Sequence, residues 1–130
     1  MILGTVLEKD HDTIKRWKSQ TTLNSLKRGQ AYTILVGEKH VQQGTFGETT
    51  AGDGSLYNGD HPPSFARPAG KSHPLAQSPL DPFRTNFGSW HPGICQFLMA
   101  DGSLRIFEDN INPEILARLV PRDLPTGDVP

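Results

Sequence analysis

His91 and the pair Asp101-Gly102 are the first residues whose chemistry could matter, and nine residues separate them. An imidazole titrates near neutral pH, so His91 could act as a base or as a metal ligand. If the intervening chain is extended, the two groups lie about 30 Å apart, at about 3.3 Å per residue. We therefore favour a structural role for His91, in which its ring bonds a backbone group or a carboxylate, and a turn role for Asp101-Gly102.

Oxygen-bearing side chains also gather in the middle of the chain. Asp53, Asn58 and Asp60 are weak candidates for calcium ligands, which Asp101 could join if folding gathers them, because calcium takes roughly six to eight oxygens. The EF-hand spacing is absent. The five histidines show neither the H-x3-H nor the H-E-x-x-H spacing, so no zinc site is expected. Calcium is thus the one cofactor that stays open.

Groups that could support catalysis or nucleic-acid binding are scarce. The sequence has no G-x-S-x-G nucleophile motif. Its single cysteine, Cys95, falls on an expected core face, where a thiol acts as packing. The net charge of −1 offers no basic field for nucleic acid. We expect neither an enzyme nor a nucleic-acid-binding protein.

Two aromatic residues, Tyr57 and Trp90, are candidates for ligand binding. Exposed aromatic rings can stack on sugars and mark binding sites. The alternative is that these rings clip a long loop onto the sheet, and we favour that alternative. The sequence leaves both interpretations open.

The chain has 130 residues, of which 35% are hydrophobic, with 13 glycines and 11 prolines. This length suits one domain, and the glycine and proline content favours turns over a helical bundle. We expect a single domain over residues 1–121 and a flexible tail over residues 122–130. No apolar run reaches the roughly 18 residues of a membrane span, and the first residues lack the pattern of a signal peptide. No membrane contact is expected from this chain itself.

The first half of the sequence predicts one strand and a long loop. Residues 33–41 begin with a β-branched apolar run, which indicates an inner strand covered on both faces. Residues 42–89 contain most of the prolines and little periodicity, so we expect a long irregular loop. Asp12 and Thr22 could each cap a short helical turn, the second of which would stop at Gly29.

The last third predicts a hairpin and a helix. Residues 94–100 and 103–107 flank Asp101-Gly102, which favours a two-residue type I′ turn. Asn112 is a good N-cap before a helix over residues 113–120, with a proline at the first helical position. The predicted fold is α+β and β-rich, with a small antiparallel sheet, a C-terminal hairpin and helix, and a long irregular loop.

A two-residue turn also fixes the register of the hairpin. It places Met99 opposite Leu104 and Phe97 opposite Ile106. The expected core face then carries five apolar side chains: Cys95, Phe97, Met99, Leu104 and Ile106.

Three motifs resemble a known family. Residues 87–105 contain the H-x9-D-G pattern, residues 33–39 read T-I-L-V-G-E-K, and residues 53–60 contain a D-G…Y-N-G-D segment. In this order, over about residues 30–121, they resemble a large family of pseudopilin-like proteins of unknown function that is expanded in planctomycetes. The family's usual D-G-T-S-N-T turn is replaced by residues 28–33, R-G-Q-A-Y-T.

The resemblance implies an extracellular or cell-envelope protein with a prepilin leader, an anchor helix and a β-rich head, of which this chain looks like the head alone. It implies a non-catalytic assembly or surface-display role in the envelope, or in a type II secretion or type IV pilus-like system, with protein partners and self-association. Such a head packs its sheet on the anchor helix, so we expect the face bearing Phe97, Met99 and Ile106 to be partly uncovered. The alternative is a calcium- or glycan-binding module built on the loop over residues 42–89.

Overall fold

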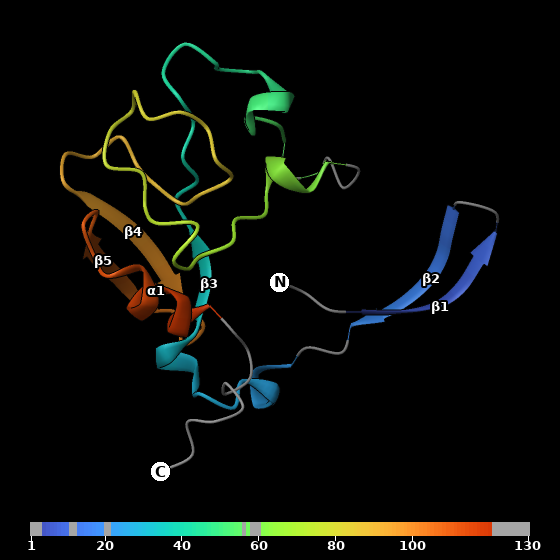
Figure 1. The fold of residues 1–130 in the computed structure, drawn as a ribbon. Coiled ribbons are helices and arrows are strands. Elements are labelled where there is room, and N and C mark those ends of the chain that lie inside the picture. The colour runs from blue at the N-terminus through green and yellow to red at the C-terminus, as the bar shows by residue number, and fades with distance from the viewer. Residues whose placement is uncertain (1–3, 11–12, 20–21, 56, 58–60, 121–130) are drawn as a thin grey trace.

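The computed structural model describes residues 4–10, 13–19, 22–55, 57 and 61–120. Its main body is a three-stranded antiparallel sheet in the order β3-β4-β5, with a C-terminal helix and extended loops (Figure 1). A separate two-stranded sheet precedes it. The predicted α+β, β-rich fold is confirmed, whereas the predicted tail over residues 122–130 lies outside the described residues.

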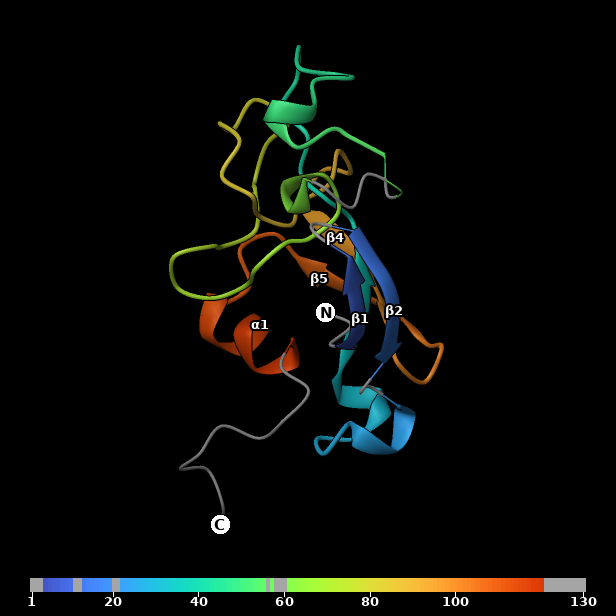
Figure 2. The same cartoon turned by 90° about the vertical axis from the view of Figure 1, so that its right-hand side faces the viewer.

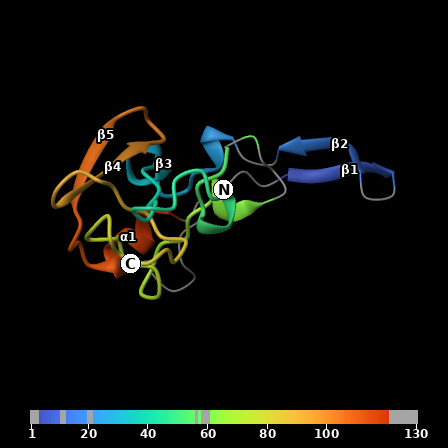
Figure 3. The same ribbon diagram turned by 90° about the horizontal axis from the view of Figure 1, so that it is seen from above.

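The strands β1 (Gly4–Asp10) and β2 (Thr13–Ser19) form an antiparallel hairpin that stands off from the main body (Figures 1 and 3). The prediction of a helical turn after Asp12 is therefore wrong, because the threonine, isoleucine and tryptophan of this segment favour a strand. A turn follows Thr22 as predicted, the 3-10 helix η1 (Leu23–Ser25), but it ends at Leu26 and not at the predicted Gly29. A second 3-10 helix, η2 (Gln30–Tyr32), follows Gly29, whose φ of 89° is left-handed.

Strand β3 (Ile34–Gly37) is shorter than the predicted strand and lies at one edge of the sheet. Its partner is the central strand β4 (Ile94–Met99), with Val36 opposite Leu98 and an irregularity between Ile34 and Val36. The prediction of a strand covered on both faces is wrong, because Val36 is 57% exposed. An apolar run alone does not distinguish a central strand from an edge strand whose outer face is apolar.

The hairpin of β4 and β5 (Leu104–Glu108) is confirmed, but its turn is not type I′. Of the two turn residues, only Gly102 has a left-handed φ, of 85°. The N–H of Gly102 donates to the carbonyl of Met99 at 3.0 Å, and the N–H of Met99 donates to the carbonyl of Ser103 at 2.8 Å. The loop therefore holds three residues and ends on a left-handed glycine, the other common solution for a short hairpin.

The longer loop shifts the register by one residue, so that Leu98 lies opposite Leu104 and Phe97 opposite Arg105. A shift of one residue moves side chains to the other face of a strand. The prediction that Leu104 and Ile106 share the core face is consequently wrong, since they are 61% and 56% exposed.

The core lies on the inner face of the sheet. Cys95, Phe97 and Met99 are fully buried there, as predicted, and Leu116 of the helix α1 (Pro113–Leu119) packs against them. Asn112 caps this helix as predicted, because its side-chain oxygen accepts the N–H of Glu114 at 2.9 Å. Figure 2 shows α1 on the side of the sheet where the loops also gather.

The segment over residues 42–89 is irregular, as predicted. It contains only the short 3-10 helices η3 (Thr49–Ala51) and η4 (Pro62–Ser64) in its described part. An isolated bridge between Lys39 and Phe87 joins it to the body, and another, between Ala76 and Gly88, lies within the segment. Among the described residues, no helix is long and apolar enough to cross a membrane.

Candidate functional site

Four apolar side chains stand exposed on the face of the sheet opposite the core. We call this set the outer face; it consists of Val36, Leu98, Leu104 and Ile106, which are 57%, 37%, 61% and 56% exposed. The pairing of the strands places three of them in one row across the sheet. An apolar surface therefore spans all three strands and lacks a cover among the described residues.

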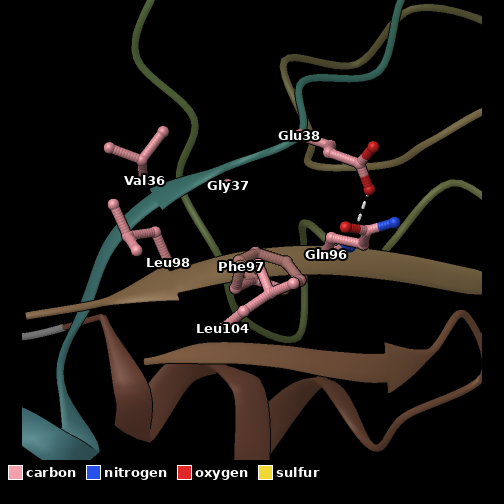
Figure 4. Close-up of a pocket in the computed structure, with 7 residues that line it drawn as sticks. All are labelled: Val36, Gly37, Glu38, Gln96, Phe97, Leu98 and Leu104. Atoms are coloured by element: carbon pink, nitrogen blue, oxygen red, sulfur yellow. Dashed lines mark hydrogen bonds between the residues drawn. The ribbon is translucent and has the colours of Figure 1, made fainter. Parts of the chain in front are cut away.

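A shallow groove of about 270 Å³ runs over this face (Figure 4). Its lining consists of Val36, Gly37, Glu38, Gln96, Phe97, Leu98 and Leu104. Gly37 is needed on the inner side of β3, because a Cβ there would lie 2.5 Å from the ring of Phe97 and 2.9 Å from that of Phe87. The absence of a side chain at residue 37 thus lets these two buried rings pack against the backbone of β3.

Glu38 closes one end of the groove and ties two strands together. Its side-chain oxygen accepts the backbone N–H of Gln96 at 2.6 Å, and its own N–H donates to the carbonyl of Gln96 at 3.2 Å (Figure 4). The other carboxylate oxygen lies 3.3 Å from Nε2 of His91. His91 therefore lies beside a carboxylate, the structural arrangement that the sequence favours.

Sequence reasoning missed Glu38 as this partner, although the residue lies within the T-I-L-V-G-E-K motif. The available signal was a charged residue directly after an apolar strand. The structure does not bring His91 to Asp101, in agreement with the expected separation. Instead, Asp101 accepts the N–H and the hydroxyl of Ser103 at 2.9 and 2.7 Å, and these bonds lower the pKa of Asp101. Asp101 and Gly102 therefore shape the hairpin turn.

Lys39 occupies the centre of the oxygen-rich part of the loop. Its ammonium donates to the carbonyls of Gly54, Ser64 and Gly52 at 3.0, 3.1 and 3.3 Å, and lies 3.3 Å from the carboxylate of Asp53. The protein thus places its own cation among these oxygens. A metal ion at this position would have to displace the Lys39 ammonium.

Asp53 is the one calcium candidate of the loop that the structure describes; Asn58 and Asp60 lie outside the described residues. One oxygen of Asp53 accepts the N–H of Gly47 at 2.8 Å and the other faces Lys39. The bond from Gly47 lowers the pKa of Asp53, and the nearby Lys39 adds to this effect. No cluster of three or more His, Cys, Asp or Glu side chains suited to a metal occurs in the part of the chain described.

Arg67 is a second cation that holds the loop. It is 7% exposed, and its guanidinium donates to the carbonyls of Gly52 and Ala66 at 3.1 and 2.9 Å. It also lies 5.4 Å from the centre of the Phe83 ring. Burial lowers the pKa of Arg67, which Asp53 partly opposes. The sequence carried no signal for this role of Arg67, because the residue binds backbone carbonyls, which any residue type can supply, and a distant aromatic ring.

The aromatic candidates are not brought together. The indole N–H of Trp90 donates to the carbonyl of Val41 at 3.0 Å, and its ring lies 5.1 Å from that of Phe46. Trp90 therefore anchors the loop to the body, although its side chain remains 45% exposed. Tyr57 is 98% exposed, and within the described residues no ring contact joins it to Trp90. Cys95 is fully buried, and burial raises the pKa of its thiol to about 12.

Fold and site together define a small β-rich α+β domain with an uncovered apolar sheet face. A family model matches residues 5–114, and the chain belongs to that family, which is described as "Protein of unknown function (DUF1559)". No curated protein and no solved structure gives a significant match.

Proposed function

We propose that this chain is a non-catalytic structural subunit of the pseudopilin-like type, which assembles with protein partners through the outer face. The proposal places it outside the cell or in the cell envelope, in a surface-display role or in a type II secretion or type IV pilus-like system. Its family membership is compatible with this role. The observation that carries the proposal is the exposure of Val36, Leu98, Leu104 and Ile106 on one sheet face.

The physical argument rests on how sheets are covered in folded proteins. A sheet buries its apolar face against another layer, and contiguous exposed apolar patches mark interaction sites. Burying a large aliphatic side chain completely is worth about 1.5–3 kcal/mol. Because the four outer-face side chains are partly exposed, a partner that covers them gains several such contributions. The carboxylate of Glu38 at the end of the groove supplies a polar rim.

The prediction that the face bearing Phe97, Met99 and Ile106 is partly uncovered is wrong in its residues. Phe97 and Met99 are buried, and only Ile106 of the three expected residues is exposed. The uncovered surface is the opposite face of the same sheet. The proposal therefore depends on the outer face and not on the predicted one.

Sedimentation velocity over a range of concentrations tests the assembly role. We expect the wild-type chain to sediment as a larger species as concentration rises, and Ile106→Lys to remain monomeric. Leu80→Lys is the matched control, because Leu80 is 71% exposed and lies in the irregular loop. A wild-type chain that stays monomeric at high concentration, or a control that dissociates equally, would contradict the proposal.

A second candidate is glycan binding, which the exposed ring pair of Phe46 and Trp90 favours. Aromatic faces stack on sugars, and Phe46 is 62% exposed. A glycan array with wild type and Phe46→Ala tests it, since that variant leaves the Trp90 clip in place. Binding by wild type that the variant loses would support this candidate; an array without signal would exclude it.

Calcium binding by the loop remains a prediction. A thermal melt with calcium or with a chelator tests it, because a ligand present at 100 times its Kd stabilises by about 2.7 kcal/mol. A rise in Tm specific to calcium would support a loop site. Equal melting temperatures would leave the loop held by Lys39 and Arg67 alone.

A further inference from the structure

We infer that β5 pairs edge to edge with β5 of a second copy of this chain, so that two three-stranded sheets become one continuous six-stranded sheet. The inference rests on the proposed assembly role and specifies its geometry. β5 is an edge strand of five residues, Leu104–Glu108, without proline, lysine or bulge. Such an edge offers its free backbone groups to another strand.

The hydrogen bonds of the hairpin determine which backbone groups are free. The bond from Met99 to Ser103 makes these residues a bonded pair, so Ser103, Arg105 and Phe107 direct their backbone groups toward β4. Leu104, Ile106 and Glu108 therefore direct theirs away from the sheet. The carbonyl of Glu108 already accepts the N–H of Ile111 at 3.0 Å. Among the described residues, the edge thus leaves both backbone groups of Leu104 and Ile106 and the N–H of Glu108 without a backbone partner.

A two-fold axis at Ile106 uses these groups without conflict. Ile106 lies opposite Ile106 of the second copy, and the two residues exchange both backbone hydrogen bonds. The N–H of Glu108 meets the carbonyl of Leu104 in the other copy, once on each side of the axis. This register pairs all five residues of β5. It forms four backbone hydrogen bonds and leaves the Glu108 carbonyl to Ile111.

Side-chain chemistry selects the same register. It places Arg105 opposite Phe107, and Leu104 opposite Glu108, so that no like charges meet. A shift by two residues toward the turn would place Arg105 directly opposite Arg105, which is unfavourable. An isologous contact of this kind closes as a dimer.

The position of β5 and the nature of the other edge support the choice of strand. β5 lies on the side of the molecule away from the β1–β2 hairpin (Figures 1 and 3). The opposite edge, β3, has four residues and an irregularity between Ile34 and Val36, which interrupts a pairing edge. Pairing through β5 also joins the two outer faces into one apolar surface, because Leu104 and Ile106 lie on the pairing strand and their side chains belong to the outer face of each copy.

Disulfide trapping tests the geometry in the full chain. In the proposed register, the two Ile106 Cα atoms lie about 5.5 Å apart, within the range that a disulfide bridges. We expect Ile106→Cys to give a covalent dimer under a mild oxidant such as copper phenanthroline. Leu104→Cys is the matched control, because it lies on the same strand and face with similar exposure. Its two copies would lie about 14 Å apart, at about 3.4 Å per residue.

A third variant separates this inference from the proposed function. Leu98→Cys lies on the central strand, so edge pairing keeps its two copies about 20 Å apart, through three strand spacings of about 4.8 Å across the sheet and about four residues of 3.4 Å along it. Cross-linking of Leu98→Cys without Ile106→Cys would mean face-to-face packing; the assembly role would survive and edge pairing would be overturned. Cross-linking of Leu104→Cys alone would overturn the register. The native Cys95 is fully buried, so the unmodified chain gives the background.

Monomeric behaviour of every variant and of the wild type would overturn both proposals. A wild-type dimer with a covalent band for Ile106→Cys only would support edge pairing and the self-association that the assembly role requires. A wild-type dimer in which none of the three variants cross-links would overturn edge pairing while leaving assembly through another surface.

Discussion

Glu38 joins two strands through its side chain as well as its backbone. Its carboxylate accepts the N–H of Gln96 at 2.6 Å and faces His91 at 3.3 Å. Hydrogen bonds to a charged group are worth about 1.5–3 kcal/mol, whereas an exposed ion pair contributes about 0–1 kcal/mol. The backbone bond is therefore the larger of the two contributions.

We predict that Glu38→Ala lowers the free energy of unfolding by about 1.5–3 kcal/mol. His91→Ala should lower it by less than about 1 kcal/mol. Urea denaturation of both variants at neutral pH measures the difference. Equal losses would show that the His91 contact, and not the bond to Gln96, carries the contribution of Glu38.

Asp53 gives the loop a dependence on pH. Its folded pKa lies below the usual value because it accepts the N–H of Gly47 and faces Lys39. As pH falls, the Asp53 carboxyl therefore binds a proton in the unfolded chain before it does so in the folded chain. The stabilisation of the folded state by Asp53 is present above about pH 3.9 and lost below it. We predict that Asp53→Asn is less stable than wild type at pH 7 by about 1–2 kcal/mol. Thermal melts from pH 7 to pH 2 should show the gap narrowing in acid; a constant gap would refute the charge-based origin.

Contacts such as those of Lys39 could not be predicted from the sequence. Its carbonyl partners at Gly52, Gly54 and Ser64 lie 13 to 25 positions away, and backbone carbonyls carry no residue-specific signal. His91 was assigned a structural role from the expected length of a strand, but the identity of its partner required the fold. Local chemistry thus predicted the separation of His91 from Asp101, whereas tertiary packing determined its carboxylate neighbour, Glu38.

At the scale of elements, the turn at Gly102 decides which face of β5 is exposed. A left-handed φ costs a residue with a Cβ about 1 kcal/mol, and less for asparagine. The position is open, with no atom within 4 Å of an added Cβ. We predict that Gly102→Ala lowers stability by about 1 kcal/mol and that Gly102→Asn lowers it by less. Chemical denaturation of the two variants tests this order, and an equal or reversed order would contradict the backbone explanation.

The elements that the sequence predicted best are those with local signals. Asn112 and the following proline predicted α1, and the strand-like segments on both sides of Asp101-Gly102 predicted the hairpin. The register was wrong because the same two residues fit a two-residue and a three-residue loop. Because the loop is one residue longer than predicted, Leu104 and Ile106 lie on the surface and not in the core. The loop segment was predicted as irregular, but its attachment through Lys39 and Arg67 was not.

At the scale of the whole molecule, the two faces of the main sheet differ in what covers them. The inner face packs on α1 and the loop, and Lys39 and Arg67 fasten that loop from within. The outer face carries four apolar side chains that remain exposed. This asymmetry is the basis for the proposed assembly role, because the described part of the chain leaves this apolar layer without a cover.

Hydrogen–deuterium exchange at low and high protein concentration tests this claim most directly. We predict that amides of Leu104–Glu108 exchange more slowly at high concentration, while the loop over residues 61–89 is unchanged. Ile106→Lys should abolish this difference, because it places like charges directly opposite each other in the proposed pairing. Exchange in β5 that is the same at both concentrations would contradict assembly through the outer face and its adjoining edge.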